Sequence, residues 1–148
     1  MSTTRFYELR KLMEKAFNER KIGNAEKLAN EYLEIADSEK ENWNYGNAIH
    51  HGNLLLGRIA LQNGKIEKAK EYLIKAGKTP GSPQLNTFGP NMKLANELLE
   101  IGEKEIVIKY IKLCEEFWDK RFSKANIVLW EESIERNETP DFKANLLY

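Results

Sequence analysis

Apolar residues recur along this chain at intervals of three and four positions, the spacing that gathers them on one face of an α-helix. The pattern is clearest in residues 53–76, where two apolar stripes lie on either side of Asn63–Gly64, a dipeptide typical of turns. No segment alternates apolar and polar residues over a useful length, so nothing indicates β-strands. The pattern predicts an all-α protein built from antiparallel helical hairpins.

Similar stripes on either side of Gly23 and Gly102 predict two further hairpins. Because such hairpins bury their apolar faces on one another, we expect a single helical-repeat domain over residues 1–148. Pro90 suits the first turn of a helix that ends at Gly102. The expected elements are hairpins at about 4–38, 43–77 and 90–120, a capping helix at 123–136 and a tail at 137–148.

The tail contains Phe142, Leu146, Leu147 and Tyr148, an apolar set that is unusual at a solvated chain end. Repeat arrays need their terminal faces covered. We therefore expect the tail to fold back and dock on the last hairpin. The alternative is that the tail inserts into another molecule, which leaves a homo-oligomer open.

Composition narrows the class of partner. Lysine plus arginine and aspartate plus glutamate number 23 each, so the formal net charge is zero. Such a chain has no broad field to attract nucleic acid or an anionic membrane, and we expect neither as a partner. Cys114 is the only cysteine, which rules out an internal disulfide. With no apolar run of signal-peptide or membrane-spanning length, we expect a cytoplasmic protein.

The middle hairpin resembles a tetratricopeptide repeat. Leu56–Gly57 stands where that motif has Leu-Gly, Ala69 stands at the alanine of its second helix, and Leu73 and Ala76 stand at the next two signature positions. The other hairpins keep weaker versions, so the resemblance covers roughly residues 5–120. The chain is also similar to small bacterial repeat proteins of unassigned function. The resemblance implies a superhelix whose concave face binds a protein or peptide, and it implies no catalytic activity.

The resemblance places side chains from the first helices of the second and third hairpins on that concave face. Arg58 and His51 would meet an acidic side chain or a carboxylate terminus, and Asn96 would donate a hydrogen bond. The alternative is that Arg58 is a solvated helix residue and His51 a hydrogen-bonded surface histidine. The predicted strip consists of His51, Leu54, Arg58, Met92, Asn96 and Leu99.

The long irregular stretch at 79–91 concentrates prolines and polar side chains, and we expect it to be ordered because proline limits the conformations of the chain. Gln84, Asn86 and Asn91 would then form a rigid polar binding surface beside the concave face. Equally, the stretch could be a connection whose amides satisfy helix ends.

No arrangement of residues indicates a catalytic centre, a metal site or a cofactor. His50 and His51 point about 100° apart on a helix and have no third histidine with which to share an ion. Cys114 falls on an apolar stripe, so we interpret it as a packing residue. Trp43 and the other tryptophans are interpreted as core or interface aromatics, because no basic stripe accompanies them.

These observations favour a protein- or peptide-binding module. One alternative is an inhibitor, similar to immunity proteins, that covers the active site of another protein. A second alternative is a small enzyme that uses His51 with the polar loop at 79–91. A pocket that joins His51 to this loop would favour the enzyme, and an open groove would favour the binding module.

Overall fold

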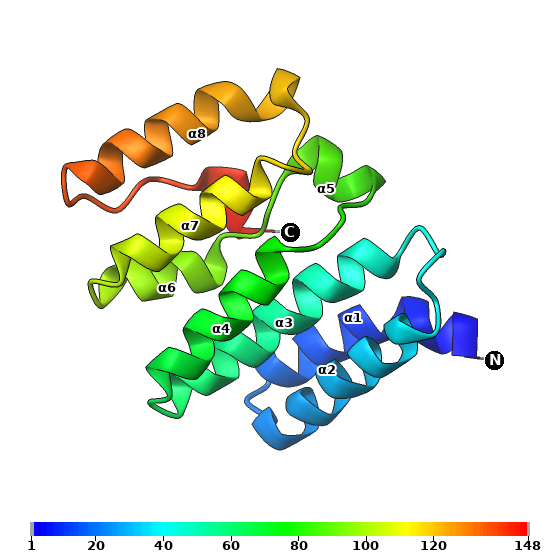
Figure 1. The fold of residues 1–148 in the computed structure, drawn as a ribbon. Helices are drawn as coiled ribbons and strands as arrows, with labels where there is room; N and C mark the ends of the chain where they lie inside the picture. The colour runs from blue at the N-terminus through cyan, green and yellow to red at the C-terminus, as the bar shows by residue number, and fades with distance from the viewer. Residues whose placement is uncertain (1, 148) are drawn as a thin grey trace.

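The computed structural model describes the backbone of residues 2–147 and the side chains of residues 4–147, and this part of the chain contains helices and no strands (Figure 1). The all-α prediction is confirmed. None of the described helices is long and apolar enough to cross a bilayer. The elements are α1 (Ser2–Asn18), α2 (Ile22–Asp37), α3 (Tyr45–Gln62), α4 (Ile66–Gly77), α5 (Pro83–Phe88), α6 (Lys93–Glu100), α7 (Lys104–Cys114), α8 (Lys120–Glu135) and a final 3-10 helix η1 (Lys143–Leu146).

Three helical hairpins follow one another across the molecule. The pairs are α1 with α2, α3 with α4, and α6 with α7, and successive pairs meet where α2 packs on α3 and α4 packs on α7. Figure 1 shows this order from the blue N-terminal hairpin to α8, which lies against α7 at the far end. Helix α3 lies in the middle of the array and contacts α1, α2, α4 and α6, so nearly all of its surface is buried.

Small residues allow α3 to approach helices of the neighbouring hairpins closely. A Cβ atom on Gly57 would collide with the side chain of Leu94, and one on Gly52 would lie 2.9 Å from the side chain of Leu33. Ala69 is fully buried between α3 and the helices beyond it. Gly57 and Ala69 therefore stand at close-approach positions, as the sequence pattern predicts.

The apolar core of the described residues falls into two clusters on either side of α3. One cluster joins α1 and α2 to one face of α3, and the other runs from the opposite face of α3 to α8 and the tail. Tyr72 packs against both clusters. Trp118 and Trp130 are buried in the C-terminal cluster, their ring centroids 5.5 Å apart, as expected of core aromatics.

The segment between α4 and α6 differs from the expectation. It is not irregular throughout, because α5 forms within it, capped by the Ser82 hydroxyl that accepts from the Leu85 N–H at 3.0 Å. Helix α6 begins at Lys93 and not at Pro90. Just before this start, the N–H groups of Asn91 and Met92 donate to His50 Nε2 and to the Asn145 carbonyl oxygen.

The boundaries of the last two long helices also differ. Helix α7 ends at Cys114, so Phe117 and Trp118 lie in the connection that follows. Helix α8 begins at Lys120 because the carboxylate of Asp119 accepts from the Arg121 N–H at 2.9 Å and caps the helix there.

The tail folds back on the C-terminal part of the molecule, as expected. Phe142 is 1% exposed, and its ring meets that of Trp130 edge-on with a centroid distance of 5.1 Å. Leu146 packs against the same cluster, whereas Leu147 is 80% exposed and covers nothing. Tyr148 lies outside the described residues.

Candidate functional site

His50 is a structural histidine in the middle of α3. Its Nε2 accepts from the Asn91 N–H at 3.0 Å, so in the neutral ring the proton lies on Nδ1, which donates to the Ala76 carbonyl oxygen at 3.1 Å. Burial lowers the pKa of His50 to about 4, which keeps the ring neutral at neutral pH. Both ring nitrogens are committed to the backbone, so His50 ties the end of α4 to the segment before α6.

Three residues of the predicted concave strip, and Asn91 of the predicted loop surface, are buried as well. His51 is 6% exposed, and its pKa lies well below the ordinary range because of burial and the adjacent ring of His50. Leu54 and Met92 belong to the C-terminal core cluster, and Asn91 is buried beside them. This burial corrects the expectation that these four side chains line an open surface, and its cause is the packing of α1 and α6 against α3. A role for them in binding a partner stays a prediction.

Arg58 and Asn96 lie at the surface but already have partners. The Arg58 guanidinium donates from Nε and Nη2 to the two carboxylate oxygens of Glu97, each at 3.0 Å, and lies 4.7 Å from the ring centroid of Phe17. Asn96 donates to Glu100 one turn along α6 at 3.3 Å. Arg58 thus joins α1, α3 and α6, which the sequence did not indicate.

A small recess joins His51 to Asn91 of the 79–91 segment. Its volume is about 60 Å³, and Arg58, Glu14 and Lys93 stand among its walls. This volume accommodates one or two water molecules, whereas substrate sites usually measure about 300–1,000 Å³. The recess is thus too small to favour the enzyme alternative.

The 79–91 segment is anchored mainly through its backbone. The Asn86 carbonyl oxygen accepts from the Asp119 N–H at 2.9 Å, and the Asn91 carbonyl oxygen accepts from the Tyr110 hydroxyl at 2.8 Å. The Asn145 amide donates to the carbonyl oxygens of Phe88 and Pro90 at 3.1 and 2.8 Å. These bonds hold the segment in place as an ordered connection, and in each of them the segment supplies a backbone carbonyl oxygen and not a side-chain amide.

The start of the segment is fixed to α3 by side chains. Ser82 donates to Asn47 Oδ1 at 2.5 Å, and the Asn47 amide donates to Gln84 Oε1 at 3.1 Å. Thr79 donates to the Gly46 carbonyl oxygen at 2.7 Å. Gln84 is exposed, but its amide oxygen already serves this network, while Asn86 lies in the wall of the groove described next.

An open groove of about 330 Å³ lies between this segment and the α2–α3 connection. Trp43 stands in it with 54% of its surface exposed, and its ring stacks on the exposed ring of Tyr7 with centroids 5.5 Å apart and planes 14° apart. We call this hollow the Trp43 groove; its lining residues are Lys40, Asn42, Trp43, Tyr45, Gly46, Pro80, Gly81, Ser82, Pro83 and Asn86. The exposure of Trp43 differs from that of Trp118 and Trp130. In the sequence, the sign that Trp43 could be exposed was its position directly after the polar run 37–42.

A larger hollow of about 610 Å³ lies at the α6–α7 turn. Two of its charged lining residues already have partners in the lining, because Lys70 pairs with Glu103 at 2.9 Å and Lys104 donates to Asn137 at 2.8 Å. The hydrogen bond from Lys70 to Glu103 raises the pKa of the lysine, so its charge is held. We regard the Trp43 groove as the better candidate because it exposes an aromatic anchor.

Residues 4–147 contain neither a cluster of metal ligands nor a reactive thiol. No three histidine, cysteine, aspartate or glutamate side chains there gather as metal ligands would. Cys114 is buried, and burial raises the pKa of its thiol well above the usual range, which keeps it protonated and unreactive. No protein-family model, curated protein or solved structure matches this chain.

Proposed function

We propose that this chain is a protein- or peptide-binding module and that the Trp43 groove is its binding surface. The observation that carries the proposal is the half-exposed Trp43 ring, already stacked on Tyr7 at the edge of an open hollow. Tryptophan and tyrosine are the side chains that most often dominate the free energy of protein association. The buried free cysteine supports a cytoplasmic location as part of the same proposal.

The groove is preorganised, which lowers the entropy cost of binding. Its wall at Pro80–Pro83 is held to α3 through Thr79 and Ser82, and proline limits the freedom of the wall further. A Cβ atom on Gly46 would overlap the Gly81 carbonyl group, so the floor and wall are in direct contact. A ligand would therefore meet a surface that needs little reordering.

The lining suggests the chemistry of the ligand. Trp43, Tyr45 and the two prolines offer apolar surface, while Asn42 and Asn86 offer amide groups at its edges. An extended peptide segment with one large apolar side chain fits this combination, with the side chain on Trp43 and the peptide groups near the amides. The concave strip implied by the tetratricopeptide resemblance is a less favoured surface, because His51, Leu54 and Met92 of that strip are buried.

The test is a selection of peptides from a displayed library on the wild-type protein, followed by binding measurements with Trp43→Ala. Truncation of the ring should weaken binding by tenfold or more, as expected for a central aromatic anchor. The melting temperature should change little because Trp43 is exposed. Phe122→Ala, which removes an exposed aromatic ring from α8, is the matched control. Equal binding by both variants would place the site elsewhere.

A further inference from the structure

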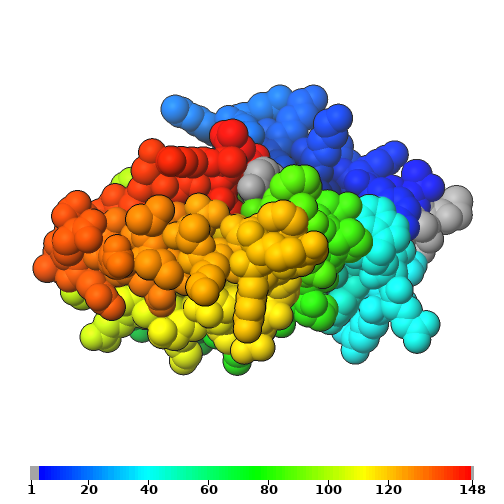
Figure 2. Space-filling model, turned by 90° about the horizontal axis from the view of Figure 1, so that it is seen from above, coloured from blue at the N-terminus to red at the C-terminus, as the bar shows by residue number. Residues whose placement is uncertain are grey.

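Helix α8 has an apolar outer surface that no described part of the chain covers. Its inner face packs on the core through Ile127, Trp130 and Ile134. Its outer side carries Phe122 and Leu129, which share one face at a spacing of seven residues, and Val128, which lies about 100° around the helix from Leu129. Figure 2 shows α8, in orange, along the front of the molecule with no other segment over it.

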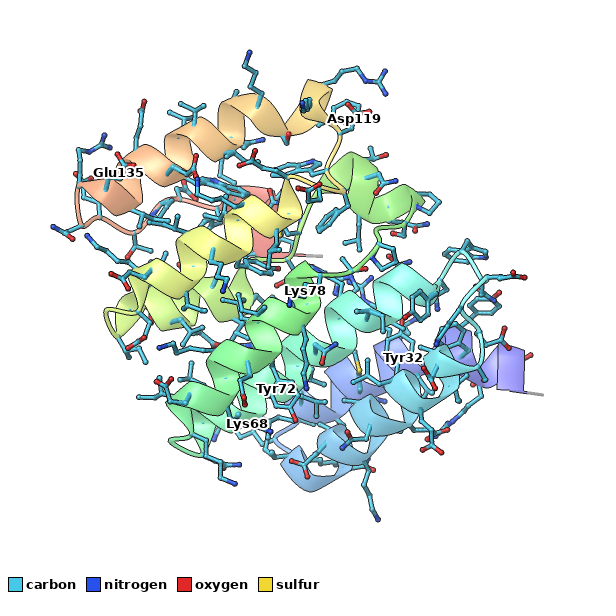
Figure 3. The ribbon with its side chains drawn as sticks, in the orientation of Figure 1. Tyr32, Lys68, Tyr72, Lys78, Asp119 and Glu135 are labelled. Atoms are coloured by element: carbon cyan, nitrogen blue, oxygen red, sulfur yellow. The ribbon has the colours of Figure 1, made fainter. Side chains whose placement is uncertain are left out.

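The charges on α8 are divided between its two ends. Lys120, Arg121 and Lys124 occupy the first part of the helix, and Glu131, Glu132 and Glu135 occupy the last part. Figure 3 labels the two ends at Asp119 and Glu135. The cations lie where the positive end of the helix dipole disfavours them, and the acids lie at the negative end, so the division does not serve the stability of the isolated helix.

Four of these residues share one flank. Lys120, Lys124, Glu131 and Glu135 follow one another at steps of four, seven and four residues, each of which returns to the same side of an α-helix. A hollow of about 330 Å³ runs along this flank and is lined by Glu115, Lys120, Ser123, Lys124, Ile127, Val128 and Glu131. The flank therefore combines a concave surface, an exposed apolar residue and a charge reversal.

We propose that two copies of this chain associate through α8, with the two helices antiparallel. The midpoint between Lys120 and Glu135 is also the midpoint between Lys124 and Glu131. If the helices cross at this point, Lys120 and Lys124 of one copy lie beside Glu135 and Glu131 of the other in a single register. A twofold axis repeats the same pairs on the other half of the interface. Val128, which is 48% exposed and lines the hollow along the same flank, then packs close to the crossing point beside Val128 of the other copy.

The ion pairs within the chain leave this flank largely available. Lys120, Lys124 and Glu135 form no salt bridge within residues 4–147, and Glu131 has only a solvent-exposed one, with Lys112 at 3.4 Å. One helix pair buries less than the roughly 800 Å² per partner of a standard interface, so the dimer is expected to be weak and reversible. This surface does not involve the Trp43 groove, so each proposal is tested independently of the other.

Sedimentation equilibrium over roughly 10–500 µM, the range in which small transient interfaces associate, is the first experiment. The average mass should rise from 17.2 kDa toward twice that value. Val128→Glu should keep the protein monomeric over the whole range, while Ile101→Glu, at a similarly exposed apolar position in the α6–α7 turn, should associate like the wild type. A wild-type protein that stays monomeric would overturn the proposal, and this flank of α8 would then be available to a different partner.

Charge reversal tests the antiparallel register. The variants Lys120→Glu/Lys124→Glu and Glu131→Lys/Glu135→Lys should each self-associate at least about tenfold more weakly, because like charges then oppose each other. An equimolar mixture of the two should recover association at the wild-type level or above, since every pair is again of opposite sign. Circular dichroism and melting curves of both variants establish that they are folded. A mixture that associates no better than its components would contradict the register.

Discussion

Residues 4–77 pack their helices through buried alanine and glycine, whereas residues 79–147 depend on polar side chains that bond to the backbone of other segments. In the first part, Ala25, Ala29 and Ala36 are fully buried against neighbouring helices. In the second part, Asn145 and Tyr110 satisfy carbonyl oxygens of the segment that precedes α6. Regular packing leaves a periodic signal in the sequence, and bonds of this second kind do not.

The difference follows from the lengths of the elements. Helices α1 to α4 have 12 to 18 residues, so a larger share of their backbone groups is satisfied within the helices and mainly the side-chain faces remain to be matched. Helices α5 and α6 are short, with six and eight residues, and the segments around them hold many peptide groups outside any helix. Those groups need partners when buried, and His50, Asn47, Tyr110 and Asn145 supply them.

The largest expected effect comes from removing the tail's contact with the C-terminal region. Phe142→Ala should lower the free energy of unfolding by about 3–5 kcal/mol, because the ring is buried against Trp130 and the cavity left behind has no other group to fill it. Leu147→Ala, four residues after the start of η1, should change it by less than about 0.5 kcal/mol since that side chain is exposed. Urea denaturation measures both. Equal effects would mean that the tail does not dock in solution.

The comparison of the two parts also shows which features of the fold could be predicted from the sequence. The hairpins, their close-approach residues Gly57 and Ala69, and the docking of the tail could be predicted because each depends on apolar periodicity or residue size. Burial of His50 and His51 could not, because α3 is surrounded by five helices and its polar residues face neighbours that lie far away in the sequence.

The candidate site was harder to predict for a related reason. A concave strip was inferred for the first helices, yet α1 and α6 close over α3 and the Arg58–Glu97 pair occupies the remaining surface. The Trp43 groove depends on where the 79–86 wall comes to lie relative to the α2–α3 connection, and that placement is set by the Ser82–Asn47 and Thr79–Gly46 bonds. A sequence does not show which polar residues pair over such separations.

The second effect concerns pH and the junction at His50. The ordinary pKa of 6.5 falls to about 4 in the folded protein, so the unfolded chain binds a proton more readily between these values. The contribution of His50 to stability is therefore complete above about pH 6.5 and is lost as the pH falls toward 4. From about pH 7 to about pH 5 this loss amounts to roughly 2 kcal/mol for His50, and His51 adds a loss of the same sign.

The variant His50→Leu separates the histidine from other titrating groups. It should be less stable than the wild type at neutral pH, because the Asn91 N–H and the Ala76 carbonyl oxygen lose their partner. Its stability should nevertheless change less between about pH 7 and about pH 5. Denaturant titrations at the two pH values give the four free energies needed. The same pH dependence in both proteins would show that His50 is not buried as a neutral ring.

The third effect tests the packing of the first part. Ala69→Leu should cost about 1–3 kcal/mol, because the larger side chain has no space between α4 and α3 and must displace its neighbours. Lys68→Leu, at the exposed adjacent position, is the control and should change stability little. Thermal unfolding followed by circular dichroism suffices for this comparison. An Ala69→Leu protein as stable as the wild type would indicate that the helix faces are assigned wrongly.

The smallest effect lies at the seam between the two parts, where Arg58 of α3 meets Glu97 of α6. The guanidinium forms two parallel hydrogen bonds of 3.0 Å, and the side chains are 21% and 33% exposed, so water screens the pair incompletely. A double-mutant cycle with Arg58→Ala and Glu97→Ala should give a coupling energy of about 0.5–1 kcal/mol. Arg58→Ala alone should cost more than Glu97→Ala, because the arginine also packs over Phe17. Lys68 and Glu71, an exposed pair 3.7 Å apart within α4, should show almost no coupling. If both cycles give the same value, the Arg58–Glu97 ion pair adds no measurable stability, and the seam is held by apolar contacts and by the hydrogen bonds of His50.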